Sequence, residues 1–221
     1  MFFATAQSQS SPSNKKNTQK FNEKDKVLEY TPLKLENRNK GRRIAIGDIH
    51  GCYLTFKKLL EETVELSKVD QIFLLGDVID KGINSRLTLD YIIGLIREGY
   101  KIYPIKGNHE EMLLMAFSNG MTFFESYLEK YNSTDLLDGH LDQYLDFISK
   151  FEYCIELDNF ILSHAGLNSN FPNPFTDFRG MFPKIDFIFD LDEYLSKNQV
   201  HGHIVRLYRE IECQVQRRNE R

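Results

Sequence analysis

The sequence predicts an α/β fold in which a mostly parallel β-sheet carries helices on its faces. From residue 42 onward, short apolar runs alternate with longer amphipathic segments in the order β-α-β-α-β-α, a pattern typical of such sheets. The 221 residues include 17 Phe and 11 Tyr, and 41% of the chain is hydrophobic, which is enough for a substantial core. The length fits one domain plus a tail.

The expected elements follow from periodicity. The apolar runs predict strands over residues 42–48, 71–77, 101–108, 153–157, 160–166 and 198–205. Helices are expected over residues 54–66, 87–99, 109–117, 121–132 and 139–151, of which the last two could form a small cap. Asn84 or Ser85 is placed to cap the second helix, and Gly99 is placed to end it.

Residues 1–40 are polar and lack a sustained period, so we expect a disordered tail followed by one domain over residues 41–221. The formal net charge of −4 argues against a nucleic-acid partner, and no apolar run reaches the length of a membrane span. Cys52, Cys154 and Cys213 form no CxxC pair. We therefore expect a reducing, cytoplasmic location.

Polar clusters follow several of the predicted strands. The clusters are GDIHG (47–51), GDVIDKG (76–82), GNHE (107–110), SHAG (163–166) and HGH (201–203). Each one alone is also explained as a turn, a helix cap or a structural histidine. Together they place donors at the carboxyl ends of strands, where open α/β sheets bind ligands.

The donor types narrow the expected metal. Carboxylates, imidazoles and an amide oxygen, without a thiolate, suit manganese, iron or zinc better than Cu(I) or an iron–sulfur cluster. Six donors exceed what one closed tetrahedral zinc site needs. Two adjacent ions that share one carboxylate fit this number. Such ions, roughly 3.5–4 Å apart, can activate a hydroxide between them and hold phosphoryl oxygens.

In this order, the five motifs resemble those of the calcineurin-like metallophosphoesterases. The resemblance is closest to the phosphoprotein phosphatase branch, with its bacterial Ser/Thr phosphatases and symmetrical diadenosine tetraphosphatases. It runs from about Arg42 to His203. It implies a metallophosphoesterase-type β-sheet sandwich flanked by helices. It also implies that Asp48 and His50 bind one metal, that Asp77 bridges both, and that Asn108, His164 and His203 bind the other.

The same resemblance implies that His109 protonates the leaving alkoxide and that Asp80 orients His109. A carboxylate three residues past the bridging Asp77 can accept a hydrogen bond from that imidazole, which fixes its tautomer and raises its basicity. The HGH motif offers a second donor, His201. The resemblance favours His203 as the ligand because the family's ligand follows a glycine.

The chain departs from the family at the phosphate contacts. Lys81 and Lys106 stand where arginines are usual, and with Asn108 they are expected to bind the substrate phosphate. Lysine keeps the charge but lacks the bidentate fork, so we expect weaker phosphate binding. The family's Trp-Arg segment has no counterpart because the chain contains no Trp, and Arg179 or Lys184 could substitute out of register.

The family usually continues past its last histidine into further strands. Only LYREIECQVQRRNER follows HGHIV here, so we expect the C-terminal strands to be truncated or absent. Their absence would expose a sheet edge.

The expected function is metal-dependent hydrolysis of phosphomonoesters, above all protein phosphoserine and phosphothreonine, with two divalent ions, for which manganese is expected and iron or zinc are the alternatives. One alternative is a hydrolase of dinucleoside polyphosphates. Another is a phosphatase-like binding protein with weak or no catalysis, which the changes at Lys81 and Lys106 favour. The presence of all six metal donors and of His109 with Asp80 argues against it.

Overall fold

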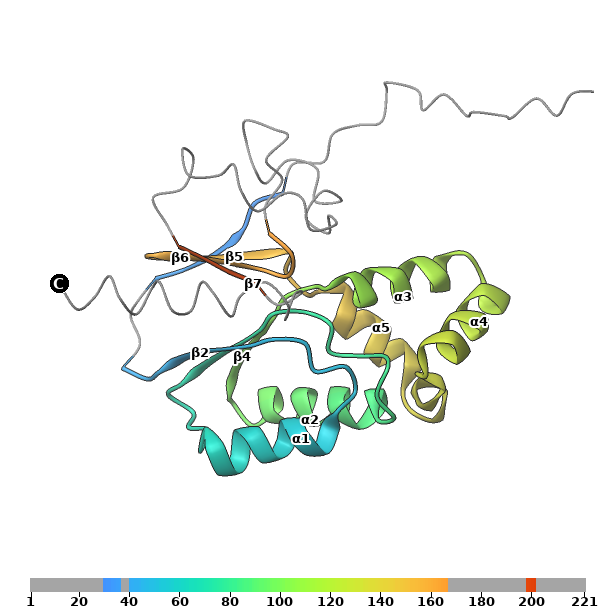
Figure 1. Cartoon of the computed structure of the whole chain (residues 1–221), viewed down its shortest axis with the longest axis horizontal. Coiled ribbons are helices and arrows are strands. Elements are labelled where there is room, and N and C mark those ends of the chain that lie inside the picture. The colour runs from blue at the N-terminus through green and yellow to red at the C-terminus, as the bar shows by residue number, and fades with distance from the viewer. Residues whose placement is uncertain (1–29, 37–39, 167–197, 202–221) are drawn as a thin grey trace, which may run out of the picture.

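The computed structural model describes residues 30–36, 40–166 and 198–201, which form two β-sheets packed face to face (Figure 1). The first sheet has the order β2-β3-β4, and its strands all run parallel. Its strands are β2 (Arg43–Ile46), β3 (Gln71–Leu74) and β4 (Lys101–Pro104). This sheet matches the alternating pattern from which it was predicted.

The second sheet has the order β1-β5-β6-β7. Its strands are β1 (Leu33–Leu35), β5 (Cys154–Leu157), β6 (Phe160–Ser163) and β7 (Asn198–His201). Strands β5 and β6 pair antiparallel because only Asp158 and Asn159 connect them, which is too short for a parallel crossover. The sandwich expectation is thus confirmed, whereas a single mostly parallel sheet does not describe the strands after residue 150.

Strand β1 corrects the expectation of a disordered tail over residues 1–40. It pairs in parallel with β5, with Leu33 opposite Ile155 and Leu35 opposite Leu157. Both leucines pack against the core between the sheets. A three-residue strand inside a polar segment is too short to show a period, which is why composition alone missed it. Residues 1–29 lie outside the described part of the chain.

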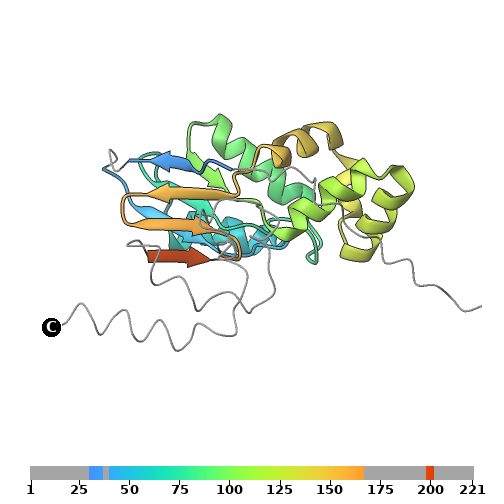
Figure 2. The same ribbon diagram turned by 90° about the horizontal axis from the view of Figure 1, so that it is seen from above.

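Helices cover the outer face of the first sheet and extend beyond one end of the sandwich (Figures 1 and 2). Under the sheet lie α1 (Tyr53–Lys58), which continues as the π-helical turn η1 (Leu59–Thr63), and α2 (Ser85–Arg97). At the end lie α3 (Asn108–Ser118), α4 (Met121–Tyr131), the 3-10 turn η2 (Thr134–Asp138) and α5 (Leu141–Ser149). We call the segment from α4 to α5 the helical cap.

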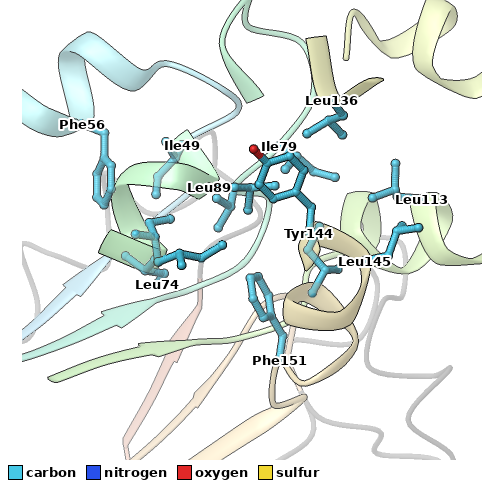
Figure 3. Close-up of a cluster of buried hydrophobic side chains, with 14 of the residues drawn as sticks. Ile49, Phe56, Leu74, Ile79, Leu89, Leu113, Leu136, Tyr144, Leu145 and Phe151 are labelled. Carbon is cyan, nitrogen blue, oxygen red and sulfur yellow. The ribbon is translucent and has the colours of Figure 1, made fainter. Parts of the chain in front are cut away.

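Strand β3 shows how the two sides of the first sheet are filled. Side chains alternate along a strand, so Ile72 and Leu74 face the helices while Phe73 and Leu75 face the second sheet. Figure 3 shows Leu74 among the side chains of the helical side. All four residues are buried, and each such side chain contributes about 1.5–3 kcal/mol. Burial on both faces explains the unbroken apolar run.

The start of α2 shows a cap that the sequence could not reveal. Asn84 occupies the N-cap position, but its side chain makes no capping hydrogen bond. Instead, Asp135 of η2 accepts the backbone N–H of Arg86 at 2.8 Å. Gly99 follows the helix with a φ of +92°, as its predicted role at the C-terminus requires. Among the described residues, no helix is long and apolar enough to cross a bilayer.

Candidate metal centre

Asp77 lies where β3 ends, on a backbone that turns sharply. Gly76 and Asp77 both have positive φ, at +97° and +49°. A Cβ at Gly76 would lie 2.5 Å from Nδ1 of His164 and 2.8 Å from Cα of Gly107. Only glycine fits this close approach. The turn therefore brings Asp77, the start of α3 and the end of β6 to one point.

The carboxylate of Glu110 holds this turn in place. It accepts hydrogen bonds from the backbone N–H groups of Asp77 at 2.9 Å, Val78 at 2.8 Å and Gly107 at 2.8 Å. The side chain is fully buried. Burial, followed by the negative charge of Asp77, raises the pKa of Glu110 to about 7, although the backbone hydrogen bonds oppose this shift. Such a carboxylate stabilises a left-handed Asp77 that would otherwise be strained.

The GDIHG motif contributes Asp48 and His50. Nδ1 of His50 lies 3.0 Å from the carbonyl oxygen of Ile79, so it donates its proton there. Nε2 then keeps a lone pair, which suits metal binding. This nitrogen lies 3.5 Å from Oδ2 of Asp77 and 3.7 Å from Oδ2 of Asp48.

His164, just after β6, approaches Asp77 from the second sheet. Its Nδ1 donates to the carbonyl oxygen of Leu75 at 2.7 Å. Its Nε2 lies 3.0 Å from Oδ1 of Asn108 and 3.5 Å from Oδ1 of Asp77. Burial lowers the pKa of His164, which favours the neutral ring. Three acceptor atoms thus face one another, an arrangement that a shared cation stabilises.

Two groups of three side chains lie close enough to hold an ion each, and Asp77 belongs to both. The groups are His50–Asp77–His109 and Asp48–Asp77–His164, with ligand atoms within 4.8 Å of one another. This sharing fits the chemistry of a bridged pair of divalent ions. Two details differ from the expected ligand sets, since Asp48 groups with His164 and His109 lies as close as a ligand. His203 lies outside the described residues, so its role as a metal ligand stays a prediction.

His109 begins α3 and contacts Asp80. Its Nδ1 lies 2.7 Å from Oδ2 of Asp80, and its Nε2 lies 3.9 Å from Oδ2 of Asp77. Burial lowers the pKa of His109, but the hydrogen bond to Asp80 and the negative charges of Asp77 and Asp80 outweigh it, so the pKa is raised. The ring can therefore carry a proton toward the centre on Nε2.

The helical cap also contacts Asp80. The hydroxyl of Tyr127 in α4 donates to Oδ2 of Asp80, and Oγ of Ser133 donates to Oδ1 at 2.5 Å. The motifs gave no indication of these residues, which are separated from Asp80 by 47 and 53 positions. Glu110, in contrast, belongs to the GNHE motif. A glutamate three residues after Gly107 at the start of a helix is a capping pattern that can be recognised in the sequence.

The two lysines at the expected phosphate contacts lie in different surroundings. Lys81 is exposed, and its Nζ lies 2.7 Å from Nε2 of His50, at the centre. Lys106 is buried, and its Nζ lies 3.3 Å from the carbonyl oxygen of Ser149 and 4.7 Å from the ring centre of Tyr153. Arg179 and Lys184 lie outside the described residues.

Comparisons with known proteins agree with these motifs. The family model for calcineurin-like phosphoesterases matches residues 41–215. A symmetrical bis(5'-nucleosyl)-tetraphosphatase from Dechloromonas aromatica is 33% identical over 128 residues, which are 56% of this chain and 43% of that protein. Its counterpart from Nitrosococcus oceani is 39% identical over 77 residues, 35% of this chain and 26% of that protein.

Among solved structures, a serine/threonine protein phosphatase from Saccharomyces cerevisiae aligns with a TM-score of 0.47 and 16% identity, over 68% of this chain and 51% of that one. The matched part of the chain spans less than half the length of these two curated relatives. The family model, in contrast, covers most of the 221 residues, including all five motifs. The chain therefore belongs to the calcineurin-like phosphoesterase family.

Proposed function

We propose that the chain hydrolyses phosphoesters with two divalent metal ions at the centre around Asp77. The observation that supports this most strongly is the pair of donor groups that share Asp77. A single ion needs no such sharing, whereas two adjacent ions require a bridging ligand. The family to which the chain belongs uses metal ions for this chemistry.

In this proposal, Asp48, His50, Asp77, Asn108 and His164 hold the ions, together with His203. Manganese is the proposed metal, with iron or zinc as alternatives, since the ligands are oxygen and imidazole nitrogen atoms. When bound, such a pair activates water and neutralises charge on the phosphoryl group. Lys81 is the proposed phosphate contact; its ammonium, which contacts Nε2 of His50, would turn from that nitrogen to the phosphate when His50 holds an ion. Lys106 could bind phosphate only after its ammonium leaves Ser149 and Tyr153.

His109 is the proposed proton donor. Asp80 holds Nδ1, so Nε2 carries the proton that the leaving oxygen takes when its bond to phosphorus breaks. The raised pKa of His109 favours the protonated ring that this role requires. The charge of Asp80 stabilises the protonated ring before transfer.

The substrate is either a phosphomonoester, above all protein phosphoserine or phosphothreonine, or a dinucleoside polyphosphate. The motif resemblance supports the first. The names of the curated relatives from Dechloromonas aromatica and Nitrosococcus oceani support the second. A side-by-side assay of a phosphoserine peptide and diadenosine tetraphosphate distinguishes them by the larger kcat/KM.

The experiment that tests the proposed function is hydrolysis of p-nitrophenyl phosphate with and without Mn²⁺, by the wild type and by Asp77→Asn. We expect Mn²⁺-dependent turnover in the wild type and a loss of at least about 100-fold in the variant, because the variant lacks the shared carboxylate. Asp158→Asn, at the β5–β6 turn, is the control and should keep full activity. Metal-independent turnover, or equal turnover in the wild type and Asp77→Asn, would contradict the proposal. No turnover of any phosphoester would favour a non-catalytic binding protein.

A further inference from the structure

A buried polar cluster connects the helical cap with the His109–Asp80 pair. Asp80 uses both carboxylate oxygens: Oδ2 faces Nδ1 of His109 at 2.7 Å and also accepts the Tyr127 hydroxyl, while Oδ1 accepts Oγ of Ser133 at 2.5 Å. Asp80 and Ser133 are completely buried, and Tyr127 is 8% exposed. The carboxylate thus receives hydrogen bonds from three separate segments of the chain.

We propose that Tyr127 and Ser133 are positioning residues, which fix the carboxylate of Asp80 and thereby aim His109 at the leaving oxygen. This rests on the proposed function, in which His109 is the proton donor. Neither residue belongs to the five motifs, and their side-chain hydrogen bonds go to Asp80, Ser85 and the backbone of His109 rather than to the proposed metal ligands. Their effect on the reaction would pass entirely through Asp80 and His109.

The geometry explains why Asp80 needs this support. The last torsion of an aspartate side chain is broad, so one hydrogen bond to His109 does not fix the carboxylate plane. Donors on both oxygens do fix it. Ser133 is itself held, because its Oγ lies 2.9 Å from Oγ of Ser85, which in turn accepts the backbone N–H of Asp80 at 2.9 Å. Backbone and side chain of Asp80 therefore belong to one closed ring of hydrogen bonds.

Tyr127 also ties Asp80 to the start of α3. Its hydroxyl oxygen lies 2.9 Å from the backbone carbonyl oxygen of His109. One turn further along α4, the ring of Tyr131 packs edge-on against the His109 ring, with centroids 5.2 Å apart. One face of α4 therefore contacts both the His109 ring, through Tyr131, and the carboxylate of Asp80, through Tyr127. Burial and the charge of Asp80 raise the pKa of Tyr127, so its hydroxyl stays protonated and remains a donor.

The role predicts a specific kinetic signature. A proton donor accelerates departure of a poor leaving group, such as phenolate, but hardly affects 2,4-dinitrophenolate, which leaves without a proton. A misaligned His109 should therefore slow hydrolysis of phenyl phosphate and spare 2,4-dinitrophenyl phosphate. The ratio of the two kcat values measured on one sample does not depend on the folded fraction. A variant that folds poorly can therefore still be tested.

The experiment measures this kcat ratio, phenyl over 2,4-dinitrophenyl phosphate, for the full chain with Mn²⁺. We expect the ratio to fall about tenfold in Tyr127→Phe and in Ser133→Ala, a fraction of the whole contribution of a general acid. The matched control is Tyr144→Phe, which removes another buried hydroxyl, one that donates to Asp90 at 2.6 Å instead of to Asp80. Its ratio should equal that of the wild type.

His109→Gln separates the failure of this proposal from that of the proposed function. A ratio that falls in His109→Gln but is unchanged in both Tyr127→Phe and Ser133→Ala overturns the positioning role and leaves the proton donor in place. A ratio that is unchanged in His109→Gln as well overturns the proton donor, and the positioning role with it. An equal fall in Tyr144→Phe would show a general effect of buried hydroxyl loss and would also overturn the proposal.

Discussion

At the scale of single residues, hydrogen bonds to backbone carbonyls decide which histidine nitrogen faces the centre. His50 donates from Nδ1 to Ile79, and His164 donates from Nδ1 to Leu75. In both rings Nε2 is therefore the atom that faces Asp77, at 3.5 Å in each case. Such outer contacts fix the tautomer and ring orientation of a metal ligand. The chain thus orients Nε2 of both rings toward Asp77.

Lys81 gives a prediction at the same scale. Its backbone has a φ of +62°, and its ammonium reaches His50, so its side chain lies at the centre. Arginine at this position adds a second, parallel hydrogen bond to a phosphate. We expect Lys81→Arg to lower KM for p-nitrophenyl phosphate by about 3- to 10-fold with little change in kcat.

Lys68→Arg is the control for this variant, because Lys68 bonds to the carbonyl oxygen of Glu98 on another part of the surface. It should leave KM unchanged. An unchanged or higher KM in Lys81→Arg would exclude Lys81 as a phosphate contact.

At the scale of elements, the ends of β2 and β3 combine strained backbone with short glycine turns. His50, Asp77, Asp80 and Lys81 all have φ between +48° and +71°. Such conformations cost about 1–3 kcal/mol each in non-glycine residues and persist where the surrounding structure enforces them. Here Glu110 and the Ser85–Ser133 pair do so. Strain of this kind gathers at functional sites, which agrees with the proposed centre.

The other end of the first sheet is held by an ion pair between Arg42 and Asp70. Asp70 is buried and accepts the backbone N–H of Arg42 at 2.8 Å and its Nη2 at 2.7 Å. The Arg42 guanidinium, and after it the backbone hydrogen bonds, lower the pKa of Asp70, against the effect of burial. This carboxylate therefore stabilises the folded state above its unfolded pKa of about 3.9, and the effect is lost as pH falls through the lower, folded pKa.

We expect Asp70→Asn to lower the urea midpoint at about pH 7. We expect the difference from the wild type to shrink at about pH 2.5, because below the unfolded pKa of about 3.9 the wild-type carboxyl takes up a proton when the chain unfolds, which favours the unfolded state. Asp146→Asn is the control, because its pair with Lys150 is exposed and exposed pairs contribute little. A difference in urea midpoint that stays constant with pH would contradict this prediction, because it would show that the charge of Asp70 does not contribute to stability.

The elements of the first sheet could be predicted because their local signals agree with their final environment. Strand β3 is buried on both faces, and its sequence is an apolar run. Helix α2 ends just before Gly99, where the glycine in the sequence predicted its end. Strand β1 could not be predicted, since Leu33 and Leu35 form a strand only through pairing with β5, about 120 residues away. The same limit applies to Tyr127 and Ser133, whose partner Asp80 is distant in the chain.

The residues of the candidate site also fall into two groups, those that local sequence predicts and those that depend on packing. Candidate metal donors could be predicted from the sequence because their chemical types and their places after strands are local properties. The structure brings Asp48, His50, Asp77, Asn108 and His164 together as that prediction required. The burial of Lys106 against Tyr153 could not be predicted from the sequence, because it depends on how α5 and the start of β5 pack against α3.

At the scale of the whole molecule, the proposed centre lies where the two sheets meet. Asp48, Asp77 and Asn108 follow β2, β3 and β4 of the first sheet, whereas His164 follows β6 of the second. Behind the centre, Phe73, Leu75 and Leu162 fill the space between the sheets. Ions bound here would link the two sheets at the carboxyl ends of β2–β4 and β6, and would stabilise the folded state in which the ligands meet.

The most direct test of the central claim is the number of Mn²⁺ ions bound per chain, measured by isothermal titration calorimetry and checked by elemental analysis after gel filtration. We expect two ions per wild-type chain, because two donor groups share Asp77. Asp77→Asn should lose both high-affinity ions, while Asp158→Asn should keep both. One ion or none in the wild type, or two ions in Asp77→Asn, would contradict a centre bridged by Asp77.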